Sequence, residues 1–245
     1  HRRHAREGRA RVVGEIDGRG VRDTHLDAVV DGPIRGARFE VGRPDARGAI
    51  LSAAVASIEE GGLANVSMRE VARRAGVSHQ LPYHYFADRE GILAAVAQAG
   101  FELLRERFMK AIALDGSGAD KLAAAGRAYV EFACDHPAHF RVMFRQDFVA
   151  MERHADAKAS ADSCFAQLPL MIAEAIEDGL PAHPNPRALV VMAWSVAHGL
   201  ACLLLDGPLA QKLPEAAGAR EQTVQDVMEA MRALIDGSTK PKKRR

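Results

Sequence analysis

The sequence predicts an all-α protein, because apolar residues recur at the three-to-four spacing of amphipathic helices from residue 47 onward. Two further observations support this fold class. Serine and aspartate precede most of these stripes and glycine follows several of them, as at helix starts and ends. No convincing stretch alternates in the period-two pattern of a half-buried strand. We therefore expect a helical bundle that begins after an irregular N-terminal region.

The composition is that of an ordinary globular chain, with 48% hydrophobic and 27% charged residues among 245. The formal net charge of +1 is nearly balanced, so any nucleic acid must be recognised by a local surface. Three widely separated cysteines, Cys134, Cys164 and Cys202, exclude a disulfide framework and fit a reducing compartment. We find no apolar run as long as a membrane span and no signal peptide, which predicts a cytoplasmic protein with no membrane partner.

The most informative stretch is Ser67–Arg89, which reads SMREVARRAGVSHQLPYHYFADR. Ser67 and Glu70 have capping-box spacing, in which each side chain satisfies an amide of the other at a helix start. Gly76 is suited to the left-handed residue that ends this helix. Ser78 as an N-cap predicts a second helix from 78 to 89. Two helices joined this closely must cross steeply, which is the geometry of a helix-turn-helix.

Pro82 lies inside the second of these helices and lacks the amide that a helix interior requires. Counted from Ser78 as the cap, it occupies the fourth helical position, so only the first intrahelical bond is lost. We expect a short helix with an irregular start.

The second helix presents mainly hydrogen-bonding and aromatic side chains, and no acidic residue interrupts them before Asp88. Such side chains reach base edges and phosphate oxygens in the major groove. From about 47 to 108 the sequence resembles the DNA-binding region of the TetR family of bacterial repressors. The shared features are the capped helix, the Ala-Gly-Val-Ser turn, the Tyr-His-Tyr-Phe close and the basic residue that opens the fourth helix.

This resemblance implies a three-helix DNA-binding head, residues 44–92, joined through a long fourth helix to a C-terminal effector-binding and dimerisation domain, residues 93–236. The Arg- and Gly-rich leader, 1–43, and the basic tail, 237–245, are typical of solvated segments. A basic arm that contacts the DNA backbone is the alternative for the leader.

Roles in the head follow from side-chain chemistry and from the resemblance. The candidates for base-edge contact are His79, Gln80 and His84. The candidates for phosphate contact are Arg47, Ser67, Ser78, Tyr83, Tyr85 and Arg89. The alternative for each is a solvent-facing polar residue or, for Tyr85, a partly buried aromatic.

The remaining elements are read from apolar stripes and their breaks. Gly61 and Gly62 end the first helix, Asp88 caps the fourth, and the sequence DGSG at 115–118 resembles a domain boundary. Pro169 is expected to kink a long helix. Outside the helix-turn-helix, the expected helices span 47–60, 88–113, 121–135, 137–148, 155–177, 187–205 and 221–235.

In the C-terminal half, Trp194, His198 and Gly199 form a Trp-x-x-x-His-Gly pattern that resembles one subgroup of TetR C-terminal domains. The resemblance implies an effector pocket between helices. Core packing is the alternative for every lining candidate, and His198 reads equally well as a satisfied core histidine. The candidates are Phe140, Phe144, Phe165, Met171, Trp194 and His198.

The segments 187–205 and 221–235 contain more Val, Leu, Met and Ala than an outer layer needs, which predicts a homodimer. Two recognition helices about one DNA turn apart would read a pseudo-palindromic operator. An unknown small apolar effector that favours a poorly fitting state would release the repressor.

Other functional classes have less support in the sequence. No P-loop, nucleophile elbow, zinc-protease or dinucleotide motif is present, so we expect no enzyme, cofactor or catalytic residue. His136 and His139 lack further ligands beside them, so no metal site is expected. The alternatives are a helical protein-interaction module and a thiol sensor that uses one of the three cysteines.

Overall fold

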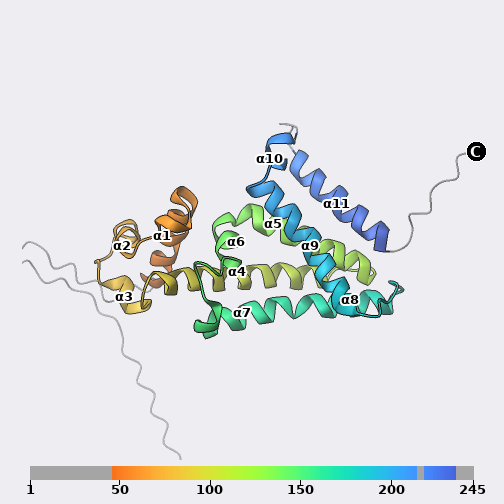
Figure 1. Cartoon of the computed structure of the whole chain (residues 1–245), viewed down its shortest axis with the longest axis horizontal. Coiled ribbons are helices and arrows are strands. Elements are labelled where there is room, and N and C mark those ends of the chain that lie inside the picture. The colour runs from red at the N-terminus through yellow and green to blue at the C-terminus, as the bar shows by residue number, and fades with distance from the viewer. Residues whose placement is uncertain (1–45, 214–217, 236–245) are drawn as a thin grey trace, which may run out of the picture. The chain divides into compact units, whose positions relative to one another are not determined.

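The computed structural model describes residues 46–213 and 218–235, and all regular structure in these ranges is helical (Figure 1). The leader and the basic tail expected from the sequence lie outside the described residues. In chain order the elements are α1 Ala46–Gly61, η1 Leu63–Asn65, α2 Met68–Ala75, α3 Leu81–Tyr85, α4 Arg89–Ile112, α5 Gly118–Asp135, α6 Pro137–Met143, η2 Met151–Arg153, α7 Ala155–Phe165, α8 Gln167–Glu177, α9 Pro186–Leu205, α10 Leu209–Lys212 and α11 Ala219–Ile235.

Local capping signals place α2 where the sequence predicts it. The Ser67 hydroxyl accepts a hydrogen bond from the Glu70 amide, and Gly76 takes the left-handed conformation with φ of 67°. The capping box is only half formed, because Glu70 does not return the bond. Its carboxylate instead accepts from Arg73 and Arg74, and these two bonds lower the pKa of Glu70 to about 2.

The start predicted for the recognition helix is wrong. α3 begins at Leu81, and the Ser78 carbonyl accepts the Leu81 amide in a preceding turn. Pro82 therefore occupies the first turn of the helix, where amides have no intrahelical acceptor and proline costs no bond. The helix is also short, because the buried Phe86 takes an extended conformation after Tyr85.

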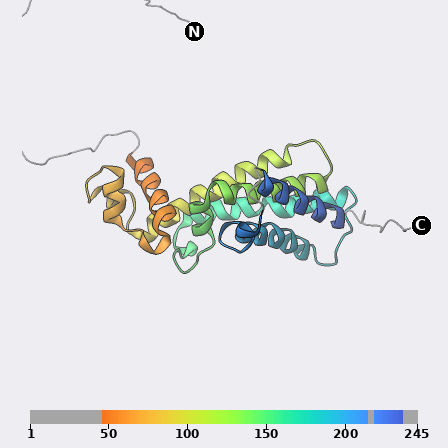
Figure 2. The same cartoon turned by 90° about the horizontal axis from the view of Figure 1, so that it is seen from above.

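The long helix α4 belongs to both the head and the body. Asp88 caps it by accepting the Gly91 amide at 2.9 Å, as the sequence predicts. Its first turns pack on α1, and its later turns pack on α5, α6 and α7 (Figures 1 and 2). The DGSG segment is thus a turn between two packed helices, and the apolar core continues from Ile50 to Met231.

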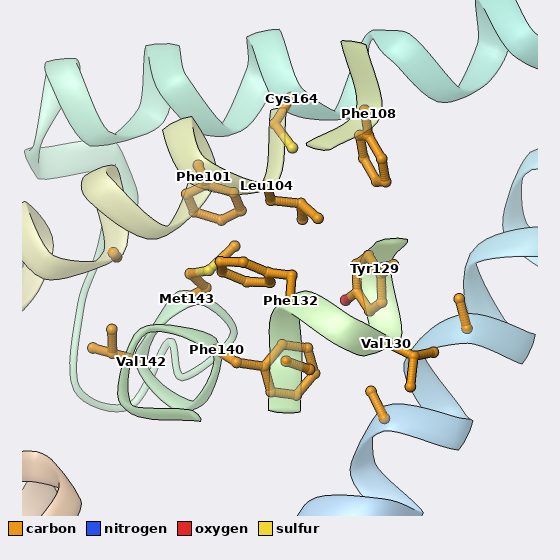
Figure 3. Close-up of a cluster of buried hydrophobic side chains, with 14 of the residues drawn as sticks. Phe101, Leu104, Phe108, Tyr129, Val130, Phe132, Phe140, Val142, Met143 and Cys164 are labelled. Carbon is orange, nitrogen blue, oxygen red and sulfur yellow. The ribbon is translucent and has the colours of Figure 1, made fainter. Parts of the chain in front are cut away.

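Figure 3 shows the centre of this core, where Phe101 and Leu104 of α4 lie near Phe132 of α5 and Met143 of α6. All four side chains are almost fully buried. The close approach of α4 to α6 depends on Gly100, because a Cβ there would lie 2.6 Å from the Met143 sulfur.

The expected helix 155–177 is two helices, α7 and α8, which meet at Ala166. Proline 169 has no amide to donate to the carbonyl of Phe165, four residues earlier, and its ring crowds that carbonyl. The helix therefore breaks before the proline rather than bending at it.

Helix α9 departs from the expectation that no apolar run is as long as a membrane span. An 18-residue window of α9 has a mean hydropathy of 2.1, and only 28% of that window is buried. One face packs on α5 through residues such as Ala197 and Ala201. The opposite face exposes Val191, Met192 and Leu203. This α9 face, as we call these three residues, is apolar, and none of the residues that the structure describes covers it.

Candidate nucleic-acid interface and effector cavity

The turn before α3 and α3 itself present the predicted contact residues to solvent. Ser78, His79, Gln80 and His84 are exposed, and the Tyr83 side chain is 58% exposed. Burial of an aromatic ring is favourable, so an open tyrosine ring is suited to contact with a partner. The polar edge of the helix-turn-helix is therefore available to a partner.

Three further candidates lie around the ends of this unit. Tyr85 is 41% exposed, and its ring meets His84 edge-on at 5.2 Å between centroids. Ser67 is exposed but already uses its hydroxyl as the cap of α2. Arg47 is exposed at the start of α1, with its guanidinium 5.4 Å from the ring centroid of Phe86, which follows α3. Arg47 is thus held close to the recognition helix.

Arg89 has a different environment from the one expected of a phosphate contact. It is half-buried, its Nε donates to the Val66 carbonyl at 2.9 Å, and an Nη donates to the Leu63 carbonyl. Its guanidinium also lies over the Phe148 ring, 5.4 Å from the centroid. This geometry gives Arg89 a structural role, because it ties the segment before α2 to the start of α4.

A cavity of about 460 Å³ in the body is the candidate effector site, and we call it the effector cavity. Four of the six predicted lining residues meet in it, namely Phe144, Phe165, Trp194 and His198. Sequence reasoning did not find the other lining residues, which come from α4, α6, the segment after α6, α7 and α9. They include Phe101, Met143, Gln146, Val149, Met151, Glu152, Lys158, Ala161, Asp162 and Ser195.

The two other predicted lining residues face elsewhere. Phe140 lines a second cavity of about 590 Å³, which lies between the end of α1 and the α6 and α9 helices. Met171 borders a small apolar void of about 30 Å³ beside Phe165 and Trp194. Phe144 and His198 line both larger cavities and separate them.

A hydrogen-bonded triad of the buried Tyr129 with the half-buried Trp194 and His198 orients the aromatic wall of the effector cavity. Trp194 Nε1 donates to the Tyr129 hydroxyl at 3.3 Å, and that hydroxyl lies 2.8 Å from His198 Nδ1. Burial raises the pKa of Tyr129 and lowers the pKa of His198, so both groups are neutral. His198 is therefore both a satisfied histidine and a cavity wall. The sequence places Tyr129 only on a core stripe, so its link to His198 was missed.

Two of the three cysteines do not resemble reactive thiols. Cys164 is buried and Cys134 is half-buried, and burial raises the pKa of both, for Cys164 to about 12. A thiol must ionise to react as a sensor, and burial opposes ionisation. Cys202 is exposed, with its Sγ 3.5 Å from His198 Nε2, so the thiol-sensor alternative is confined to this residue.

Two family models match the chain. Residues 50–96 match the model described as bacterial regulatory proteins, tetR family, and residues 122–231 match the tetracyclin repressor-like C-terminal domain. The first match covers α1, the helix-turn-helix and the start of α4. The second covers most of the body, including the effector-cavity residues of α6, α7 and α9.

Relatives and solved structures agree with these matches. The transcriptional activator FasR of Mycolicibacterium smegmatis is 28% identical over 167 residues, which cover 68% of this chain and 73% of that protein. The transcriptional regulator BetI of Rhizobium meliloti is 37% identical over 109 residues, which cover 44% of this chain and 47% of BetI. The chain thus matches less than half the length of BetI.

The structure of FadR from Bacillus subtilis, in complex with stearoyl-CoA, shares the fold with a TM-score of 0.63 at 18% identity. The match covers 78% of this chain and 98% of FadR. Head, body and relatives thus lead to one conclusion: the chain is a DNA-binding transcriptional regulator and belongs to the TetR family.

Proposed function

We propose that this regulator is a cytoplasmic, non-enzymatic repressor that binds a pseudo-palindromic operator as a homodimer and is released by a small apolar effector. The observation that carries the proposal is the exposed row formed by the polar and aromatic side chains between Ser78 and Tyr85, on a head whose opposite side is buried core. We assign residues 44–92 to the DNA-binding head and 93–236 to the effector-binding and dimerisation domain. α4 belongs to both, because it packs on α1 and on α5 to α7.

Within the head we retain His79, Gln80 and His84 as base-edge contacts. Gln suits adenine, and histidine suits the acceptors of guanine. Arg47, Ser67, Ser78, Tyr83 and Tyr85 remain the proposed phosphate contacts, since all five are exposed. Arg89 leaves this set because its side chain is half-buried and two backbone carbonyls hold its guanidinium in place.

The dimer interface that we propose is centred on the α9 face. A Cβ at Gly199 on α9 would meet no atom from other parts of the described chain within 4 Å, so a partner helix can approach closely there. Helix α11 contributes less to the proposed interface than the sequence predicts for 221–235. Its Val224, Met228 and Met231 are buried inside the chain, where α11 packs on α5. Leu234 alone among its large apolar residues is strongly exposed in the part the structure describes.

The effector site that we propose is the effector cavity. We also assign the C-terminal domain to the Trp-x-x-x-His-Gly subgroup, on the pattern formed by Trp194, His198 and Gly199 of α9. The cavity volume of about 460 Å³ suits one small ligand. Four aromatic rings line it, and the triad with Tyr129 fixes the orientation of two of the lining side chains. Because FadR is seen with stearoyl-CoA, acyl thioesters belong in the ligand panel beside simple apolar molecules.

Replacement of an exposed aromatic on α3 tests the DNA-binding role. We expect Tyr83→Ala to raise the dissociation constant for DNA flanking the protein's own gene by about tenfold, because one phosphate contact and its packing are lost. The fold should survive, since Tyr83 is 58% exposed. A gel-shift titration at physiological salt measures the effect. The matched control is Met109→Ala, an exposed apolar position on α4 far along the body, and equal affinities for the two variants would remove Tyr83 from the interface.

A further inference from the structure

The segment 148–154, which follows α6, forms one wall of the effector cavity. Val149 and Met151 contribute apolar lining and Glu152 contributes to the mouth. Val149 is almost fully buried, so the segment is packed into the body and does not hang free. Any ligand that fills or enlarges the cavity must press on this wall.

The same segment is fastened to the first turn of α4 by one side chain, Glu90. Its Oε1 accepts the Ala150 amide at 3.1 Å and lies 3.1 Å from His154 Nε2. Its Oε2 accepts from Arg153 at 3.3 Å. These contacts lower the pKa of Glu90, with the Ala150 amide as the largest cause. One carboxylate thus receives donors from three residues of the segment.

The neighbouring residue carries the connection onward to the head. Arg89 stacks against Phe148, the first residue of the segment, at 5.4 Å from its centroid. On its other side Arg89 donates to the carbonyls of Leu63 and Val66. Val66 directly precedes Ser67, the residue that caps α2 of the helix-turn-helix. A continuous set of contacts therefore joins the cavity wall to the DNA-binding motif.

We infer that Glu90 is a positioning residue that couples the effector cavity to the head, by holding the 148–154 segment against the first turn of α4. A ligand that moves Val149 and Met151 outward strains the bonds to Glu90 and shifts the Phe148–Arg89 stack. That shift changes how Arg89 holds the start of α2. The inference rests on the proposed function, since it requires a ligand in the cavity and DNA on the head. Contacts alone are not coupling, so the test must measure coupling directly.

A side chain built into the cavity replaces the unidentified ligand in this test. Ala161 lines the cavity from α7, and Ala161→Trp places an indole in that space. In the otherwise unchanged protein we expect the operator dissociation constant to rise about tenfold, within the usual range of allosteric coupling. In the Glu90→Ala background we expect Ala161→Trp to change it by less than about twofold, because the wall is already detached. Glu106→Ala, at an exposed position on α4, is the control background and should preserve the full effect.

Hydrogen exchange of the full-length protein provides a readout that needs no DNA. Both Glu90→Ala and Ala161→Trp should speed exchange at the Ala150 amide, whose acceptor is Glu90 Oε1. If the indole does not fit and the variant fails to fold, Ala161→Leu replaces it as a smaller filler.

The results separate this inference from the function on which it rests. An equal effect of the filler with and without Glu90 would overturn the coupling role, and so would a folded filler variant with unchanged affinity and unchanged exchange. Absence of operator binding by the unmodified protein would refute the proposed function instead. If neither substitution changes the exchange rate of the Ala150 amide, that result alone would refute the positioning role.

Discussion

Val191→Glu should convert the protein from a dimer to a monomer and weaken operator binding by roughly a hundredfold or more. Val191 is 48% exposed on the apolar α9 face. In a two-fold dimer each substitution occurs twice, so two carboxylates would be buried close to one another. Juxtaposed like charges cost several kcal/mol of association free energy, and each ~1.4 kcal/mol is a factor of ten.

The oligomeric state is measured by sedimentation velocity and the affinity by gel shift on the same preparation. Ala159→Glu is the matched control. Ala159 is exposed on α7, away from the α9 face, and the substitution adds the same charge to a helix. The control should remain dimeric and bind DNA normally. A dimeric Val191→Glu with unchanged affinity would show that the α9 face is not the interface.

Phe101→Ala should lower the free energy of unfolding by about 3–5 kcal/mol, the usual cost of removing a buried phenylalanine ring. Phe101 is 2% exposed, and its ring packs edge-on against Phe144 and Phe165 with centroids 6.1 and 5.8 Å away. Because the Phe101 ring also lines the effector cavity, its loss both destabilises the core and enlarges the cavity. Urea denaturation at a fixed protein concentration measures the change.

Met109→Ala on the same helix supplies the comparison, since Met109 is 45% exposed. Its effect should stay within about 0.5 kcal/mol, as for most surface substitutions. If both variants unfold at the same urea concentration, α4 does not run through the core in the way described here.

The sequence allowed prediction of those features that depend on near neighbours. The Ser67 cap, the left-handed Gly76 and the Asp88 cap each depend on atoms a few residues away, and all three are present. Where two residues signal different starts for the same helix, the sequence did not show which of them the structure follows. Ser78 and Pro82 both mark helix starts, and the structure follows the proline, since a helix that begins at Leu81 sacrifices no amide.

Features that depend on distant partners could not be read from the sequence. The carbonyls that accept from Arg89 belong to residues 23 and 26 positions earlier in the chain. Tyr129 meets its partners His198 and Trp194 69 and 65 positions away. An arginine or tyrosine has the same local pattern whether its partner is a phosphate, a carbonyl or a histidine. Only the fold distinguishes these cases.

The same limit explains the partial success at the C-terminal helices. An apolar stripe shows that one face of a helix is covered, but it does not show which part of the protein covers that face. The stripe of α11 is covered by its own chain, whereas α9 keeps an apolar face open. The expectation about membrane-span length was wrong for α9, because both its buried face and its exposed face are apolar.

Hydroxyl-radical footprinting of the unmodified protein on DNA flanking its own gene, at physiological salt, tests the central claim most directly. Two copies of the exposed row from Ser78 to Tyr85 should protect two half-sites related by a pseudo-two-fold axis. The centres of these half-sites should lie about one helical turn apart or a multiple of it, near 34 Å per turn. Protection of a single half-site would contradict a dimeric regulator that reads an operator. So would the absence of any protected site at protein concentrations at which the protein already binds nonspecific DNA.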